Sequence, residues 1–228
     1  QIRIGSLSLQ LEELESSVVG AQLGGQAITS SLKAGAIGLV IVMIFMIVFY
    51  AVPGVAAAIA LALYTGLVIA TLYLFEITLT LPGIAGIILG IGMAVDANVV
   101  IFARIREEIA SGKTVQTSMK VGFQKAMSAI LDGNITTLLA AVVLMALGSG
   151  TVKGFAYTLM IGILLSMFTA LIITRWILYA LYGIGLKNEK FYGKAKERKS
   201  IDFIGHRKVF FILSAVLILA GFVGMGVH

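Results

Sequence analysis

The chain has 228 residues, of which 59% are hydrophobic and only 12% are charged, and its mean hydropathy is +1.05. Because soluble domains carry about 25% charged residues, this composition excludes an ordinary water-soluble protein. The absence of cysteine excludes a disulfide framework and a thiolate metal site, whereas the net charge of +6 leaves nucleic-acid binding open until the basic residues are located.

Residues 1–32 are predicted to end an extracytoplasmic domain and to lead into the membrane. The stretch IRIGSLSLQLEEL, residues 2–14, alternates apolar and polar side chains, which is typical of a half-buried β-strand. A strand needs pairing partners that this sequence does not supply, so we expect the chain to be a piece of a longer protein. Residues 16–33 predict a short interfacial helix before the first span.

Six apolar stretches are long enough to suggest transmembrane helices, since a spanning helix needs about 20 apolar residues. They cover residues 33–52, 55–75, 79–103, 133–149, 154–182 and 207–227. The stretch 133–149 is short, so we expect this helix to begin earlier, near Lys125. The predicted fold class is an all-α membrane protein in which residues 33–182 form a five-helix bundle and residues 207–228 add one further helix.

The connections between the predicted helices are short, so neighbouring helices are expected to pack antiparallel. Pro53 and Gly54 turn the first span into the second, and Pro82 suits the first turn of the third span. The loop 104–125 is longer and amphipathic, and we place it at the membrane surface with Ser111-Gly112-Lys113 separating two short helices. Residues 183–206 are predicted to be a basic linker.

The basic residues report membrane topology rather than nucleic-acid binding. Of the 17 lysines and arginines, all but Arg3, Lys33 and Lys153 fall in the segments 104–125 and 175–208. Cytoplasmic loops of membrane proteins carry this excess of positive charge. We therefore place both segments in the cytoplasm and the N-terminal residues, the loops near 76–80 and 149–153, and the C-terminus on the other side.

The carboxylate of Asp96 lies in the middle of the third predicted span. A charge at such a position costs about 2.5 to 3.5 kcal/mol on insertion scales, and intramembrane acids therefore usually serve a function. Desolvation favours the neutral acid, which can carry a proton. The structural alternative is an acid that stays protonated and hydrogen-bonded to a neighbouring helix.

Small and polar residues surround Asp96 in the sequence. Small residues with four-residue spacing form one stripe along this span, and Gly92 lies one turn before Asp96. These small residues predict close helix packing. They are Gly86, Gly90, Gly92 and Ala94. Asn98 is expected to add a polar group near the same face. In the following span, Asp132 reads as a helix cap or as part of a hydrated path, and Thr136 and Thr137 as contacts between helices.

An enzyme is not expected. An intramembrane aspartyl protease needs two carboxylates that share a proton, and its Gly-x-Gly-Asp signature is absent because Met93 follows Gly90-Ile91-Gly92. His206 and His228 show no metal-ligand spacing. We therefore predict neither a catalytic residue, nor a metal, nor a cofactor other than protons.

Three stretches resemble the SecD/SecF family, whose members include the fused SecDF membrane proteins of the bacterial Sec export system. GIAGIILGIGMAVDANVVIFARIREE resembles the most distinctive SecD signature, and ILDGNITTLLAA followed by GSGTVKGFAYTLMIGILLSMFTALIITR resembles the next. SIDFIGHRKVFFILSAVLIL is similar to the start of SecF. The chain thus resembles a piece that runs from the end of the first periplasmic domain to the first SecF-like helix.

The resemblance implies a multi-pass protein of the bacterial cytoplasmic membrane, in the resistance-nodulation-division (RND) superfamily, that uses the proton-motive force to assist preprotein export. It implies the SecYEG channel, the SecF half, the translocating preprotein, and YidC-type and YajC-type proteins as partners, and no nucleic acid. Asp96 matches the family aspartate of the proton pathway. Asn98, Asp132, Thr136 and Thr137 match polar family positions of less clear role.

Two other functions remain open at this point. An RND-type transporter of small molecules or lipids would share the helical core, and large periplasmic domains with aromatic or acidic pockets would mark that class. A structural scaffold of the translocon would use Asp96 only as a hydrogen-bonding acid. Loss of proton-dependent export in Asp96→Asn, with membrane insertion intact, would separate the proton-coupled function from the scaffold.

Overall fold

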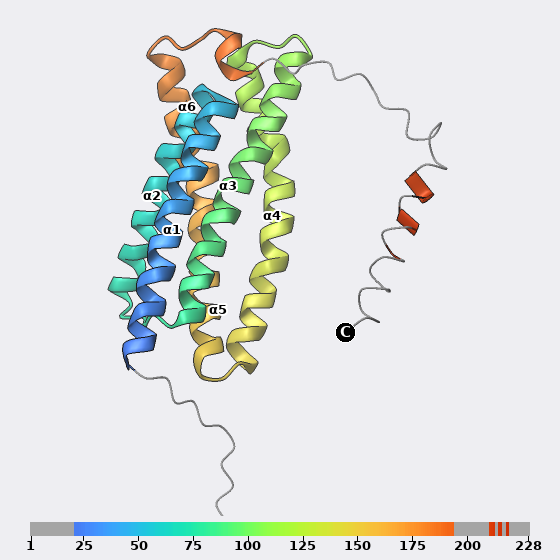
Figure 1. Cartoon of the computed structure of the whole chain (residues 1–228). Coiled ribbons are helices and arrows are strands. Elements are labelled where there is room, and N and C mark those ends of the chain that lie inside the picture. The colour runs from blue at the N-terminus through green and yellow to red at the C-terminus, as the bar shows by residue number, and fades with distance from the viewer. Residues whose placement is uncertain (1–20, 194–209, 213, 216–217, 219–228) are drawn as a thin grey trace, which may run out of the picture. The chain divides into compact units, whose positions relative to one another are not determined.

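The structure is a computed structural model that describes residues 21–193, 210–212, 214, 215 and 218 (Figure 1). The helices are α1 (Ala21–Tyr50), α2 (Val52–Leu74), α3 (Leu81–Ala110), α4 (Val115–Leu147), α5 (Gly150–Phe168), the π-helix η1 (Thr169–Ile173), α6 (Thr174–Gly183) and the 3-10 helix η2 (Glu189–Tyr192). Because α5, η1 and α6 form one span, the described residues contain five helices long and apolar enough to cross a membrane. No strand occurs among these residues.

Two of the predicted elements fall on parts of the chain that the structure leaves undescribed. The predicted strand at residues 2–14 lies outside the described residues, and the predicted sixth span at 207–227 lies mostly outside them. The chain divides into two units, Gln1–Ala195 and Lys196–His228, and the five spans belong to the first. The interfacial helix expected for residues 16–33 is not separate, because α1 continues without a break from Ala21 into the first span.

The turns that contain proline are those that the sequence predicts. Pro53 lies in the first turn of α2 and Pro82 in the first turn of α3, where the missing N–H of proline leaves no helical bond unmade. Between α1 and α2 the chain turns at Ala51, whose φ is +52°. Gly54 then packs so closely on the backbone of Met46 that no Cβ would fit there.

The helix α4 is much longer than predicted, since it begins at Val115 and continues unbroken to Leu147. The loop 104–125 is accordingly not a pair of short helices. Its first part is the end of α3, its second part is the start of α4, and the turn between them is near Gly112, whose φ is +85°. Asp132 lies in the interior of α4, so the prediction that it caps a helix is wrong.

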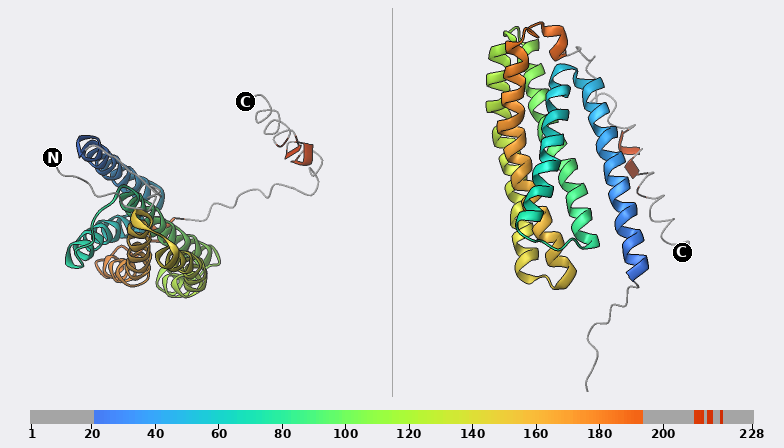
Figure 2. Two further views of the ribbon diagram at one scale, coloured as in Figure 1. Left: turned by 90° about the horizontal axis from the view of Figure 1, so that it is seen from below. Right: turned by 90° about the vertical axis from the view of Figure 1, so that its left-hand side faces the viewer.

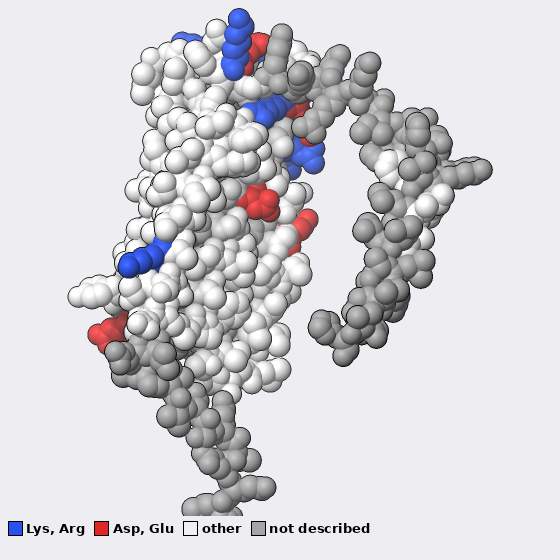
Figure 3. All heavy atoms as spheres, in the orientation of Figure 1, with Lys and Arg blue, Asp and Glu red and all other residues white. Residues whose placement is uncertain are grey.

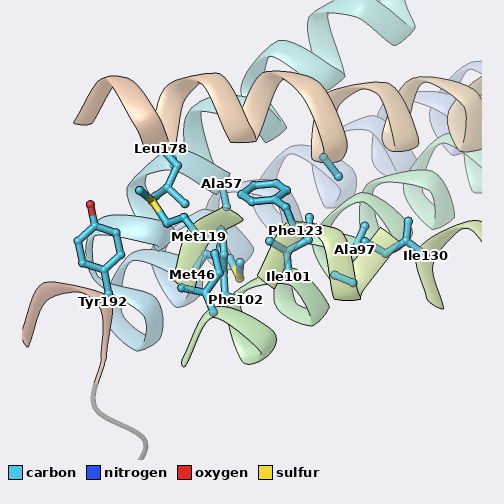
Figure 4. Packing of buried hydrophobic residues seen from close by; sticks show 14 of the residues in the cluster. Met46, Ala57, Ala97, Ile101, Phe102, Met119, Phe123, Ile130, Leu178 and Tyr192 are labelled. Atoms are coloured by element: carbon cyan, nitrogen blue, oxygen red, sulfur yellow. The ribbon is translucent and has the colours of Figure 1, made fainter. Parts of the chain in front are cut away.

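The helix α3 lies in the middle of the bundle. It packs against α1, α2, α4 and α5, and a view along the helices places α1 and α4 at opposite edges (Figure 2). A cluster of buried side chains holds one end of the bundle together (Figure 4). It joins Met46 of α1, Phe102 of α3, Phe123 of α4, Leu178 of α6 and Tyr192 of η2. This cluster fixes the register of α3 against its neighbours.

The charged side chains gather at the same end as this cluster (Figure 3). Among the described residues, only Lys33 and Lys153 of the lysines and arginines lie toward the opposite end. This distribution follows the positive-inside pattern expected from the sequence. On the face that Figure 3 shows, few charged side chains lie between the two ends, and acidic atoms are among them on the side of α3 and α4.

Candidate functional site

Asp96 lies at the middle of α3, about four turns from either end of the helix. Its side chain is exposed within the described residues, because it points away from the packed interior toward the side of α4. One turn before it on α3 lie Gly92, which has no side chain, and Met93, which lines the same pocket. An acid at this depth is the polar feature of the bundle that most needs an explanation.

Asp96 lines a pocket of about 200 Å³ between α3 and α4, which we call the α3–α4 pocket. The lining residues are Met93, Asp96, Ala97, Val100, Ala129, Ile130, Gly133, Asn134 and Thr137. No basic side chain is among them, so the described residues provide no cation to balance the carboxylate. The pocket is large enough for a few water molecules, which need polar partners of the kind that Asp96 and Asn134 provide.

The polar side chains of α4 near this pocket bond to their own helix. Asn134 donates its Nδ2 to the carbonyl of Ile130 at 2.7 Å, and the Thr137 hydroxyl donates to the carbonyl of Gly133 at 3.1 Å. These bonds explain how α4 passes through a glycine and several polar residues without breaking. They also leave the Oδ1 atom of Asn134 available to accept a hydrogen bond from a protonated Asp96 or from water.

The structure brings together only some of the predicted site residues. Thr137 shares the α3–α4 pocket with Asp96, whereas Asp132 and Thr136 are exposed on α4 and do not line it. Asn98 was expected near the same face as Asp96, but it is buried, since two residues along a helix correspond to about 200° of rotation. Asn134 lines the pocket and was missing from the predicted site.

Asn98 belongs instead to the packed face of α3. Its Nδ2 donates to the carbonyl of Ala94 at 2.9 Å, and its Oδ1 atom has no hydrogen-bond partner among the described residues. On the same stripe, Gly86 contacts Thr158 and Phe155 of α5. The stripe therefore sets how closely α3 approaches α5.

Gly90 marks the tightest crossing on this face. The Tyr64 hydroxyl of α2 fills the space where a Cβ of Gly90 would lie, and the Cα of Gly162 on α5 would be 3.6 Å away from it. The Tyr64 hydroxyl is fully buried and has no hydrogen-bond partner in the described part of the chain. Gly92 behaves differently, because its Cβ would meet open space, so the close packing predicted for Gly92 is not found in the described bundle.

The basic end of α3 is fastened to its neighbours by Arg106. Its guanidinium donates to the carbonyls of Phe49 at 2.5 Å and Tyr192 at 3.3 Å, and it lies 4.4 Å from the ring centroid of Tyr50. Phe49 is in the last turn of α1, where carbonyls lack helical partners. Burial raises the pKa of the Tyr192 hydroxyl to about 12, so it stays protonated and donates to Leu186 at 2.9 Å.

Glu108 joins α3 to α4 at the same end. Its buried carboxylate pairs with Lys113 in the turn and with Lys125 of α4, the latter at 2.6 Å. These ion pairs contrast with Asp96, which has no such partner among the described residues. At the basic end, ion pairs thus join α3 to α4, whereas in the α3–α4 pocket the acid has no ion-pair partner within the described bundle.

The last span contains a π-helical turn that the sequence did not predict. Thr174, the first residue of α6, donates from its backbone N–H to the carbonyl of Thr169, five residues earlier, and its hydroxyl donates to the same carbonyl at 3.1 Å. Thr169 and Thr174 are buried, and η1 packs against α2 and α3. Such π-bulges are frequent at functional sites because they let a helix shift its register locally.

The α3–α4 pocket contains one carboxylate, that of Asp96, and no histidine, cysteine or second acid lines it among the described residues. The described residues contain no cluster of three or more histidine, cysteine, aspartate or glutamate side chains that could hold a metal ion. A single carboxylate in an apolar surrounding can lose its charge by taking up a proton. Each change of charge alters the free-energy cost of placing the group within the membrane. Asn134 and Thr137 are the polar neighbours of Asp96 in this pocket.

Comparison with known proteins gives one family. The sequence profile described as protein export membrane protein SecD/SecF, C-terminal, matches residues 4–183. The chain is 52% identical over 203 residues to the protein translocase subunit SecD of Acidaminococcus fermentans, covering 88% of this chain and 49% of that protein. It is 53% identical over 178 residues to SecD of Synechocystis sp., covering 78% of this chain and 38% of that protein.

A solved structure has the same fold. The crystal structure of SecDF, a translocon-associated membrane protein from Thermus thermophilus, matches with a TM-score of 0.78 and 33% sequence identity. The match covers 90% of this chain and 28% of that chain. The chain thus spans about half or less of the length of the relatives it matches.

Proposed function

The chain belongs to the SecD/SecF family of protein export membrane proteins. We therefore propose that it is the membrane core of a SecD-type subunit that assists protein export. In this proposal the proton-motive force drives the subunit, and Asp96 carries the proton. The Sec translocon and its SecYEG channel, the SecF half, YidC-type and YajC-type proteins and the exported preprotein are the partners of the intact protein. Its location is the cytoplasmic membrane.

The position of Asp96 carries this proposal. It is an acid at the centre of a spanning helix, it lines the α3–α4 pocket, and no basic residue lines that pocket with it. A carboxylate in this place costs about 2.5 to 3.5 kcal/mol while it is charged. Protonation removes much of that cost, so the two protonation states favour different surroundings for α3.

The packing of α3 supports a link between protonation of Asp96 and a movement of this helix. On its packed face α3 is held against α2 and α5 through Gly86 and Gly90, whereas on the Asp96 face it borders a pocket. A neutral Asp96 tolerates closer apolar contact than a charged one, which requires water or a cation. Alternation between the two states therefore favours alternating helix packing, which the intact protein can transmit to its extracytoplasmic part.

Replacement of Asp96 by asparagine tests this proposal. Asp96→Asn keeps the size and polarity of the side chain, but the asparagine amide does not take up and release a proton as a carboxyl group does. We expect the proton-driven part of export to be abolished, with membrane insertion and amount of protein unchanged. The measurement is preprotein translocation in membrane vesicles that contain the intact protein, with and without an imposed proton gradient.

The matched control is Asp132→Asn, which removes an acid from α4 that does not line the pocket. We expect export in this variant to keep its response to the proton gradient. Export that responds equally in wild type and in Asp96→Asn would support the scaffold function instead. Equal losses of proton-driven export in both variants would show that export depends on the acidic charge of the spanning helices in general, rather than on the acid in the α3–α4 pocket.

A further inference from the structure

A second pocket lies at the end of the bundle opposite to the basic end. It has a volume of about 640 Å³ and lies between the α2–α3 turn and the start of α5, two segments that run side by side in the right-hand view of Figure 2. We call it the turn pocket. Its lining residues are Phe75, Glu76, Ile77, Thr78, Thr80, Gly150, Lys153, Gly154, Tyr157, Met160 and Ile161.

The turn pocket contains one negative and one positive side chain. Glu76 and Lys153 both line it and both are exposed, yet neither takes part in an ion pair within residues 21–193. At the basic end, by contrast, Glu108 is neutralised by two lysines. Two opposite charges that face one pocket without pairing to each other can bind a ligand that carries both signs.

The remaining wall of the turn pocket is part polar and part apolar. Thr78, Thr80 and Tyr157 add hydroxyl groups, while Ile77 and Ile161 are among its apolar side chains. The hydroxyls suit a hydrogen-bonding headgroup and the apolar part suits hydrocarbon. A ligand that combines these features at the end of a membrane-spanning bundle is a phospholipid.

The protein holds this pocket in a defined shape. The Thr80 hydroxyl accepts from the backbone N–H of Gly83 at 3.1 Å, and a Cβ on Gly154 would lie 2.7 Å from that same hydroxyl oxygen. The start of α3 is therefore in direct contact with α5. Glu76 has a φ of +51°, a conformation that few residues other than glycine adopt, and this places its side chain at the turn.

We propose that the turn pocket binds the headgroup of an aminophospholipid, such as phosphatidylethanolamine, in the extracytoplasmic leaflet. Glu76 binds the ammonium group, Lys153 binds the phosphate, and the apolar residues contact the upper part of an acyl chain. An anionic lipid such as phosphatidylglycerol carries no ammonium group and would leave Glu76 unpaired. A soluble zwitterion lacks the chain that the apolar wall accommodates.

Lipid retention by the intact purified protein tests this site. The protein is incubated with equal amounts of phosphatidylethanolamine and phosphatidylglycerol, and the bound lipids are counted by native mass spectrometry. We expect preferential retention of phosphatidylethanolamine. Glu76→Gln is expected to lower the affinity for this lipid at least about tenfold, the effect of one lost charge-assisted hydrogen bond, without lowering that for phosphatidylglycerol.

Further variants separate this site from general lipid contact. Lys153→Gln is expected to weaken retention of both lipids. Glu76→Asp keeps the charge and is expected to retain the preference for phosphatidylethanolamine. If one variant fails to fold, the others still test the site. Glu189→Gln and Lys190→Gln alter exposed charges near the basic end and serve as controls. Equal retention of the two lipids by wild type, or an unchanged preference in Glu76→Gln, would overturn the proposal.

Discussion

The two faces of α3 differ in how tightly they are packed and in what they carry. On one face, Gly86 and Gly90 bring α3 into contact with α5 and with Tyr64 of α2, and Asn98 is buried there. On the other face, Asp96 borders a pocket of about 200 Å³ and has no charged partner among the described residues. One helix thus combines a fixed face, which holds it in place, with an open face, where a charge can change.

The largest effect is expected from filling the packed face. In Gly90→Val the added side chain has no space, because the Tyr64 hydroxyl occupies it, and overpacking of this kind costs about 1–3 kcal/mol. Gly92→Val, one half-turn away on the same helix, meets open space and is expected to leave stability nearly unchanged. Melting temperatures of the purified intact variants measure the difference, and equal values would contradict the distinction between the two faces.

A smaller effect is expected from a polar group in the α3–α4 pocket. Thr137→Val keeps the shape of the side chain but removes a hydroxyl that lines the pocket with Asp96. We expect the proton-driven part of export to fall about fivefold, the equivalent of one hydrogen bond of about 1 kcal/mol. Thr136→Val is the control, since Thr136 makes the same type of bond, to Asp132 at 3.0 Å, outside the pocket. Equal export rates in the two variants would argue against a role of Thr137.

The smallest effect is expected at Tyr64, and its sign is informative. The Tyr64 hydroxyl is buried at the crossing with Gly90 and Gly162 and lacks a hydrogen-bond partner within the described bundle. Since an unsatisfied buried hydroxyl is costly, Tyr64→Phe is expected to stabilise the protein, by less than about 1 kcal/mol. The melting temperature checks this. A clear destabilisation would mean that the hydroxyl is bonded, for example to a buried water.

The sequence predicted the starts of α2 and α3 to within three residues, at turns that contain proline. α2 begins at Val52 and α3 at Leu81, each with a proline in its first turn, because proline restricts the backbone in the same way in water and in a membrane. The glycine stripe of α3 was also predictable from its four-residue spacing. These features depend on local geometry alone.

The error at α4 has a physical reason. Asp132, Gly133 and Asn134 are typical of a helix start in water, where solvent competes for backbone groups. In an apolar surrounding the backbone bonds within the helix are retained, and Asn134 and Thr137 bond to carbonyls of the preceding turn. Once α4 is known to be continuous, the spacing of Ile130, Asn134 and Thr137 places them on one face, and this would have identified Asn134.

Two further features depended on tertiary structure. Asn98 and Asp96 are close in sequence, yet the burial of Asn98 shows that it faces the interior while Asp96 faces the pocket. The π-helical turn η1 was not predicted, because its sequence TALII contains no glycine or proline that would mark an irregular turn. No basic side chain lines the pocket of Asp96 among the described residues, and none of their ion pairs includes this acid.

Infrared difference spectroscopy of the intact protein can observe the proposed change on Asp96. The carbonyl band of a protonated carboxyl group is recorded before and after a proton gradient is imposed across vesicles, for wild type and for Asp96→Asn. We predict a band whose intensity changes with the gradient in wild type and which is missing in the variant. A band in wild type that does not respond to the gradient would show that Asp96 keeps its proton, and would contradict its role as the proton carrier.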